Sequence, residues 1–66
     1  MINFELLNAI RLAGLTQRKF AELVGDDASI VSRAIAGLWN LDDARRTRYA
    51  QVLKCSVDEL FPENKG

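Results

Sequence analysis

The fold is decided by the stretch from Leu15 to Gly37, which reads LTQRKFAELVGDDASIVSRAIAG. Its first half predicts a helix over Gln17 to Val24, because the hydroxyl of Thr16 can accept a backbone hydrogen bond at the start of such a helix. Three apolar residues at helical spacing form the expected buried side: Phe20, Leu23 and Val24. Gly25 follows them and ends this first short helix.

The second half of the stretch predicts another capped helix, over Ala28 to Ala36, with Asp27 at its N-cap and Gly37 after its end. Its expected inner side consists of Val31, Ala34 and Ile35. The small side chain of Ala21 allows the two helices to cross closely. Two capped helices joined by a short turn have the layout of a helix-turn-helix, whose second helix enters the major groove of DNA.

The rest of the chain shows helical periodicity only. A first helix is expected over Asn3 to about Ala13, with Phe4, Leu6, Leu7 and Ile10 as its apolar side and Gly14 after it. Two more are expected over Asp43 to about Leu53, capped by Asp42, and over Val57 to Phe61, capped by Ser56. The sequence therefore predicts a compact all-α domain over residues 1–61 and a C-terminal tail over 62–66, of which Glu63 to Gly66 are expected to fray.

Composition excludes several classes of function. The chain has 66 residues, no histidine, one cysteine, and nine basic against nine acidic side chains. A Ser-His or Cys-His nucleophile pair cannot form without histidine, so we expect no enzyme. One cysteine provides neither a zinc site nor an internal disulfide, so we expect no metal or cofactor and a reducing, cytoplasmic environment. Zero net charge means that binding to a polyanion requires a local basic patch.

The second helix of the central stretch supplies the candidate base-reading residues. With Val31 and Ala34 pointing inward, the outward face is expected to hold Ala28, Ser29, Ser32 and Arg33. An arginine can pair through two hydrogen bonds with guanine, a serine can contact either kind of base, and an alanine can touch the methyl group of thymine. The alternative interpretation is a solvated helix face with Arg33 in a weak surface ion pair.

Basic residues are segregated along the chain despite the neutral total. Between Ala28 and Lys54 lie five basic side chains and two acidic ones. Candidate phosphate contacts are Gln17 at the start of the first helix of the central stretch, together with Arg18, Arg45 and Arg46. The same charges fit an ordinary solvated surface, so this assignment stays a hypothesis.

Two sets of motifs carry a family resemblance. The first comprises Leu15-Thr16-Gln17, Phe20-Ala21, Val24-Gly25, Val31-Ser32-Arg33 and Gly37, and the second is the run from Leu53 to Leu60, LKCSVDEL. With both in the same relative register, the chain resembles the Cro and lambda-type repressor family over about Leu15 to Phe61. The resemblance implies a five-helix DNA-binding domain that acts as a dimer on a near-palindromic operator, without cofactors or small-molecule substrates.

Several residues near the ends of the expected helices keep more than one interpretation. Trp39 lies in the loop after the base-reading helix, where it can touch DNA, support a dimer interface or fold back on the core. Val57, Leu60 and Phe61 are candidate dimer contacts, although Leu60 and Phe61 can equally cover the core.

The sequence thus predicts a sequence-specific regulator of transcription that binds double-stranded DNA, of phage or bacterial type, and represses by occupying its operator. The alternative is a protein-interaction module on the same fold, such as an antirepressor or an antitoxin-like partner binder. Asp26, Asp42 and the apolar pair Leu38-Trp39 depart from the family pattern and favour that alternative.

Overall fold

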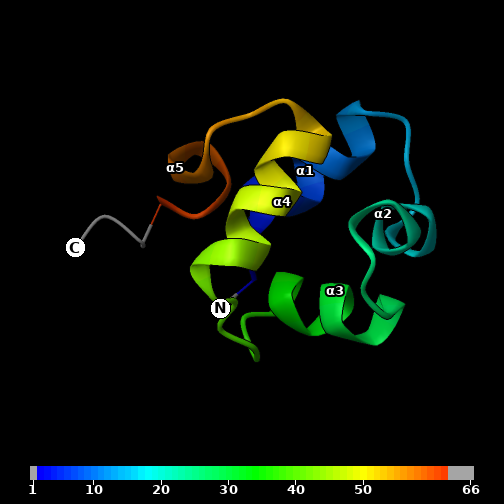
Figure 1. Cartoon of the computed structure of the whole chain (residues 1–66), viewed down its shortest axis with the longest axis horizontal. Helices are drawn as coiled ribbons and strands as arrows, with labels where there is room; N and C mark the ends of the chain where they lie inside the picture. The colour runs from blue at the N-terminus through cyan, green and yellow to red at the C-terminus, as the bar shows by residue number, and fades with distance from the viewer. Residues whose placement is uncertain (1, 63–66) are drawn as a thin grey trace.

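Five helices follow one another in the computed structural model, which describes residues 2–62 (Figure 1). No strand occurs within these residues, so the expectation of an all-α fold is confirmed. The expected tail residues 63–66 lie outside the described part of the chain. The helices are α1 (Phe4–Leu12), α2 (Gln17–Val24), α3 (Ala28–Ile35), α4 (Asp43–Leu53) and α5 (Val57–Leu60).

Side-chain caps explain where most of the helices begin. The hydroxyl of Thr16 accepts a hydrogen bond from the Lys19 amide at 3.1 Å, and the carboxylate of Asp42 accepts one from the Arg45 amide at 2.9 Å. Ser56 forms a reciprocal capping box with Glu59 at the start of α5. Asp27 precedes α3 as expected, but its side chain makes no capping hydrogen bond.

The start of α1 is tied to two distant helices through Asn3. Its side chain caps α1 by accepting from the Leu6 amide at 3.0 Å and donates to the Leu60 carbonyl at 2.8 Å. Its backbone amide donates to the Ile35 carbonyl at 2.6 Å. This buried asparagine therefore fastens the first helix to the ends of α3 and α5, a role that its position at a helix start does not reveal.

The core is built around an edge-to-face contact between Phe20 of α2 and Tyr49 of α4, whose ring centroids lie 4.9 Å apart. The expected inner residues of α3 are all buried, as are Leu6 and Ile10 of α1. Two expected core residues are exposed instead, Phe4 and Leu23. Each lies at the edge of its apolar stripe, where no neighbouring helix covers it.

Leu60 and Phe61 lie in the core of the single chain. Their burial agrees with the alternative that they cover the core, and contact of Val57, Leu60 and Phe61 with a second subunit stays a prediction. Val57 is half-buried and packs against the same core.

The helices α2 and α3 pack against each other at one end of the molecule. Figure 1 looks along α2 while α3 lies across the page, so the two helices cross steeply after the short connection over residues 25–27. Helix α4 contacts both α2 and α5, which places it between the two ends of the domain. None of the helices formed by residues 2–62 has the length and apolar character that a membrane span requires.

Candidate nucleic-acid interface

The outward face of α3 carries three exposed polar side chains. Ser29, Ser32 and Arg33 are exposed, while Val31, Ala34 and Ile35 point into the core. Because residues three and four apart lie on one side of a helix, the three polar side chains share a face. Within residues 2–62, Arg33 forms no ion pair, so its guanidinium is available to a ligand.

Ala28 differs from the other expected base readers. It is half-buried and packs against the core rather than standing on the outward face. It begins α3 directly after the N-cap, where the chain turns in from the connection to α2. The exposed face of α3 is therefore narrower than the sequence predicts and contains Ser29, Ser32 and Arg33, while their role as base readers stays a prediction.

The start of α2 presents a second polar group of residues. Arg18 is exposed and forms no ion pair among the described residues, and Gln17 beside it is half-buried. Lys19 is exposed and lies 3.7 Å from Glu22, a long contact of little energetic weight at the surface. The start of α2 and the end of α3 thus each have an arginine that is exposed to solvent, Arg18 and Arg33.

Arg45 pairs with a carboxylate of its own chain. Its Nε atom lies 3.1 Å from the carboxylate of Asp26, in the connection between α2 and α3, and that carboxylate is only 5% exposed. The Arg45 side chain itself is 34% exposed, so it pairs with Asp26 while part of its guanidinium still faces solvent, and its contact with a phosphate stays a prediction. The hydrogen bond and the negative charge of Asp26 raise the pKa of the Arg45 guanidinium.

Two further groups of α4 hold the same connection. The Tyr49 hydroxyl donates to the Asp26 carboxylate at 3.2 Å, and Arg48 donates from its guanidinium to the Val24 carbonyl at 2.9 Å. Burial, and then the charge and hydrogen bond of Asp26, raise the pKa of Tyr49. We call Asp26, Arg45 and Tyr49 the turn cluster. It fixes the α2–α3 connection to α4.

Sequence reasoning treated Asp26 only as a departure from a family pattern and missed its structural role. A signal for that role was available in the sequence. Arg45 and Tyr49 are four residues apart on one helix and so present a cation and a phenol on one face. An acidic residue at a connection between helices is a natural partner for such a pair.

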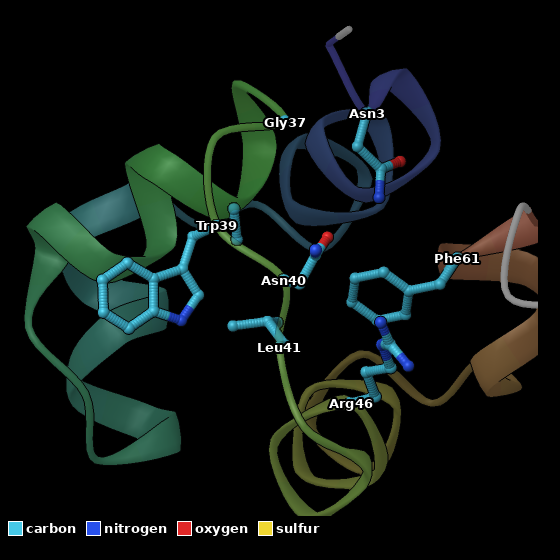
Figure 2. Close-up of a pocket in the computed structure, with 8 residues that line it drawn as sticks. Asn3, Gly37, Trp39, Asn40, Leu41, Arg46 and Phe61 are labelled. Atoms are coloured by element: carbon cyan, nitrogen blue, oxygen red, sulfur yellow. The ribbon is translucent and has the colours of Figure 1, made fainter.

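Arg46 is also held by its own chain. Its guanidinium lies over the Phe61 ring, 5.7 Å from the centroid, and contacts the exposed carboxylate of Asp43 at 3.6 Å. Figure 2 shows this guanidinium next to the Phe61 ring at one side of a pocket of about 280 Å³. The side chain is 20% exposed, so it is largely covered by its own chain, and its contact with a phosphate stays a prediction.

Trp39 lies on the other side of that pocket, with Asn40 and Leu41 between its indole and the Phe61 ring (Figure 2). Trp39 is 41% exposed, so it is not buried in the core. Of the three interpretations of this residue, contact with DNA and contact with a second subunit remain.

Residues 2–62 contain no group of three or more carboxylate or thiol side chains that could hold a metal ion. Comparison of the chain with protein-family models, with curated proteins and with solved structures finds no match.

Proposed function

We propose that this protein binds double-stranded DNA and regulates transcription, with α3 reading bases and α2 contacting the backbone as a helix-turn-helix. The observation that carries this proposal is that Arg33, which forms no ion pair among residues 2–62, lies on the exposed face of α3 with two short side chains, Ser29 and Ser32. Short neighbours leave the long Arg33 side chain unobstructed. It can therefore reach the floor of a groove and form two hydrogen bonds with guanine.

The dimensions of α3 suit this role. An α-helix with its side chains is about 10–12 Å across, which matches the width of the major groove of about 12 Å, and α3 has eight residues that can lie in it. Ser29 and Ser32 lie on the same face as Arg33 and have a hydroxyl that can donate to or accept from a base edge. One short helix reads few base pairs, so useful specificity requires a homodimer on two half-sites.

Backbone contacts are assigned to the start of α2. Thr16 already accepts from the Lys19 amide, but the amides of Gln17 and Arg18 have no partner within the helix and favour an anion such as a phosphate. Gln17 can donate from its side-chain amide, and Arg18 adds a positive charge that no carboxylate among residues 2–62 neutralises. These contacts position the protein on the duplex without carrying sequence information.

The regulatory action follows from occupancy: a dimer bound at a promoter excludes the polymerase. We place this action in the cytoplasm, where the single free thiol of Cys55 stays reduced, and assign the protein no catalytic step and no cofactor. A net charge of zero keeps binding to random DNA weak, so discrimination depends on the base contacts of α3.

A second candidate function is a protein-interaction module. It is favoured by an open groove of about 450 Å³ beside α1 and α5, which is lined by Ala9, Leu53 and Leu60 among others. At its edge stands Leu12, which is 89% exposed. An exposed apolar groove of this kind can bind the apolar face of a helix from a partner protein.

Selection of bound duplexes from a random pool tests the proposal. We expect the selection to recover a near-palindromic motif, and we expect affinity for that motif to fall steeply with salt as counterions are released. Selection that recovers no motif, or binding to a partner protein that is insensitive to salt, would favour the interaction module instead.

A further inference from the structure

The exposed side of α1 forms one wall of the open groove of about 450 Å³ beside α1 and α5. Leu6 and Ile10 of α1 are buried in the core, whereas Glu5, Ala9 and Leu12 line the groove. Residues three or four positions apart follow one another along one side of a helix, so these three form a single stripe. From Glu5 to Leu12 the stripe runs for about 10 Å, at about 1.5 Å per residue.

The other side of the groove consists of side chains that the fold holds in place. Leu53 and Leu60 belong to the core, and Cys55, between α4 and α5, is half-buried against it. The backbone carbonyl of Leu60 also accepts a hydrogen bond from the Asn3 side chain at 2.8 Å. The groove is therefore preformed, which lowers the entropic cost of binding a partner.

The charged residues that line the groove, among residues 2–62, are both acidic. Glu5 comes from α1 and forms no ion pair within that part of the chain. Glu59 comes from α5, and one of its carboxylate oxygens accepts from the Ser56 amide at 3.2 Å. The basic residues Arg11 and Lys54 are next to lining residues in the sequence but do not line the groove themselves. An apolar groove with a carboxylate on each side complements a partner that is apolar in the middle and basic at its edges.

We infer that the groove binds an amphipathic helix of a partner protein, one that has lysine or arginine side chains on both sides of an apolar stripe. The apolar stripe packs against Ala9, Leu12 and Leu60, and the cations pair with the two carboxylates. A length of about 10 Å accommodates about two turns of such a helix, with apolar residues at i, i+3 or i+4, and i+7. A second copy of this chain is a poorer occupant, because a contact of groove with groove brings the same carboxylates together.

The groove and α3 lie in different parts of the molecule. Figure 1 shows the end of α1, the connection between α4 and α5, and α5 itself in the upper half of the view, while α3 lies at the bottom. A helix in the groove therefore leaves the exposed face of α3 open. The inference deepens the second candidate function by naming the chemistry of the partner. Binding of that partner and DNA at the same time rests on the proposed function.

Selection from a displayed library of helical peptides of about 15 residues tests the inference on the full chain. We expect recovered peptides to have the apolar spacing above with flanking lysine or arginine. The best peptide should bind with a dissociation constant on the order of tens of micromolar, because the groove is smaller than a standard interface. Its charge-reversed form, with glutamate at each basic position, should bind about tenfold more weakly. Fluorescence anisotropy of the labelled peptides measures both affinities.

Two pairs of exposed residues locate the contact. Leu12→Ser should weaken binding of the recovered peptide by about tenfold, while Leu38→Ser, at an exposed leucine after α3, should change it by less than about twofold. Glu5→Lys should weaken it by about fivefold, while Glu22→Lys makes the same change of charge on α2 and should leave it within about twofold.

The single cysteine provides a local probe, because Cys55 lines the groove. Bound peptide should slow the alkylation of its thiol, which mass spectrometry follows over time. An unchanged rate at saturating peptide would overturn the inference, since the peptide would then lie elsewhere on the surface.

The other outcomes separate the inference from the proposed functions. A library that yields no binding helix overturns it and removes the observation that favours an interaction module. Peptides that bind equally well with reversed charge overturn the basic partner and leave the interaction module standing. A basic peptide that binds at the groove supports the inference even if selection of duplexes recovers no motif, in which case the DNA-binding proposal alone fails.

Discussion

The arginines of α4 and those of the α2–α3 pair have opposite environments, although the sequence presents them alike. Arg45 is bound to the buried carboxylate of Asp26, and Arg48 donates to the carbonyl of Val24. Arg18 and Arg33 stand in solvent without an ion pair among residues 2–62. The same side chain thus holds the fold in one region and is left open to a ligand in the other.

This difference changes how the neutral total charge is understood. Asp26 neutralises Arg45, whereas Arg18 and Arg33, like Arg11 and Lys54, are exposed and form no ion pair among residues 2–62. A count of basic residues along the chain cannot separate the two groups, because the decision depends on which carboxylate the fold brings near each guanidinium. Substitutions in the two regions should therefore have different effects on stability and on binding.

The largest effect is expected at the turn cluster. Asp26→Ala leaves the buried Tyr49 hydroxyl without its acceptor and Arg45 without its carboxylate, and should lower the free energy of unfolding by about 2–3 kcal/mol. Asp27→Ala is the matched control. Its side chain is exposed and makes no capping bond, so the loss should stay within about 0.5 kcal/mol. Urea unfolding measures the free energy of unfolding of both variants. Equal losses would contradict the structural role assigned to Asp26 and not to Asp27.

A smaller effect is expected from alkaline pH through Tyr49. The pKa of Tyr49 in the folded protein is raised above the ordinary value of 10. The contribution of its neutral hydroxyl to the free energy of unfolding is therefore fully present below pH 10 and is lost as the pH rises further. At about pH 11 the unfolded chain has released the phenol proton, which should cost wild type about 1 kcal/mol relative to Tyr49→Phe. Urea unfolding of wild type and Tyr49→Phe, once below about pH 10 and once at about pH 11, measures this difference. Parallel stability curves for the two proteins would contradict it.

The single tyrosine allows an independent check. Absorbance of the phenolate should appear well above pH 10 in the folded protein and near pH 10 in urea. A titration at the same pH in both states would mean that Tyr49 is not held by burial and by Asp26.

The smallest effect on stability is expected at the exposed arginine of α2. Arg18→Ala should change the free energy of unfolding by no more than about 0.5 kcal/mol, because the side chain has no partner to lose among residues 2–62. If Arg18 contacts a phosphate, the variant should also weaken binding to all duplexes alike and reduce the salt slope by about one. An unchanged slope would exclude Arg18 from the backbone contacts.

Sequence reasoning located the helices because their ends are local features. Thr16, Asp42 and Ser56 each cap the helix that their position predicts, and Gly25 ends α2 in the left-handed conformation with φ of 79°. These signals depend on a few neighbouring residues and not on the tertiary fold. The bounds of α2 therefore agree with the prediction at both ends.

Contacts between distant residues were not predictable in the same way. Asp26 and Arg45 are separated by 19 positions, and Asn3 reaches Leu60 across 57. Which edge of an apolar stripe stays uncovered also depends on the packing of other helices, which is why the exposure of Leu23 was missed. The open face of α3 was predicted correctly except for Ala28, since the inward residues of a helix determine its outward side.

The most direct test of the central claim, that the exposed face of α3 reads DNA, compares wild type and Arg33→Ala on two duplexes of equal length at one salt concentration. One duplex carries the selected motif and the other a scrambled sequence. We expect Arg33→Ala to lose about 1–3 kcal/mol of binding free energy on the selected motif while its binding to the scrambled duplex stays nearly unchanged. Equal losses on both duplexes would contradict it, because Arg33 would then hold phosphates and another surface would have to read the bases.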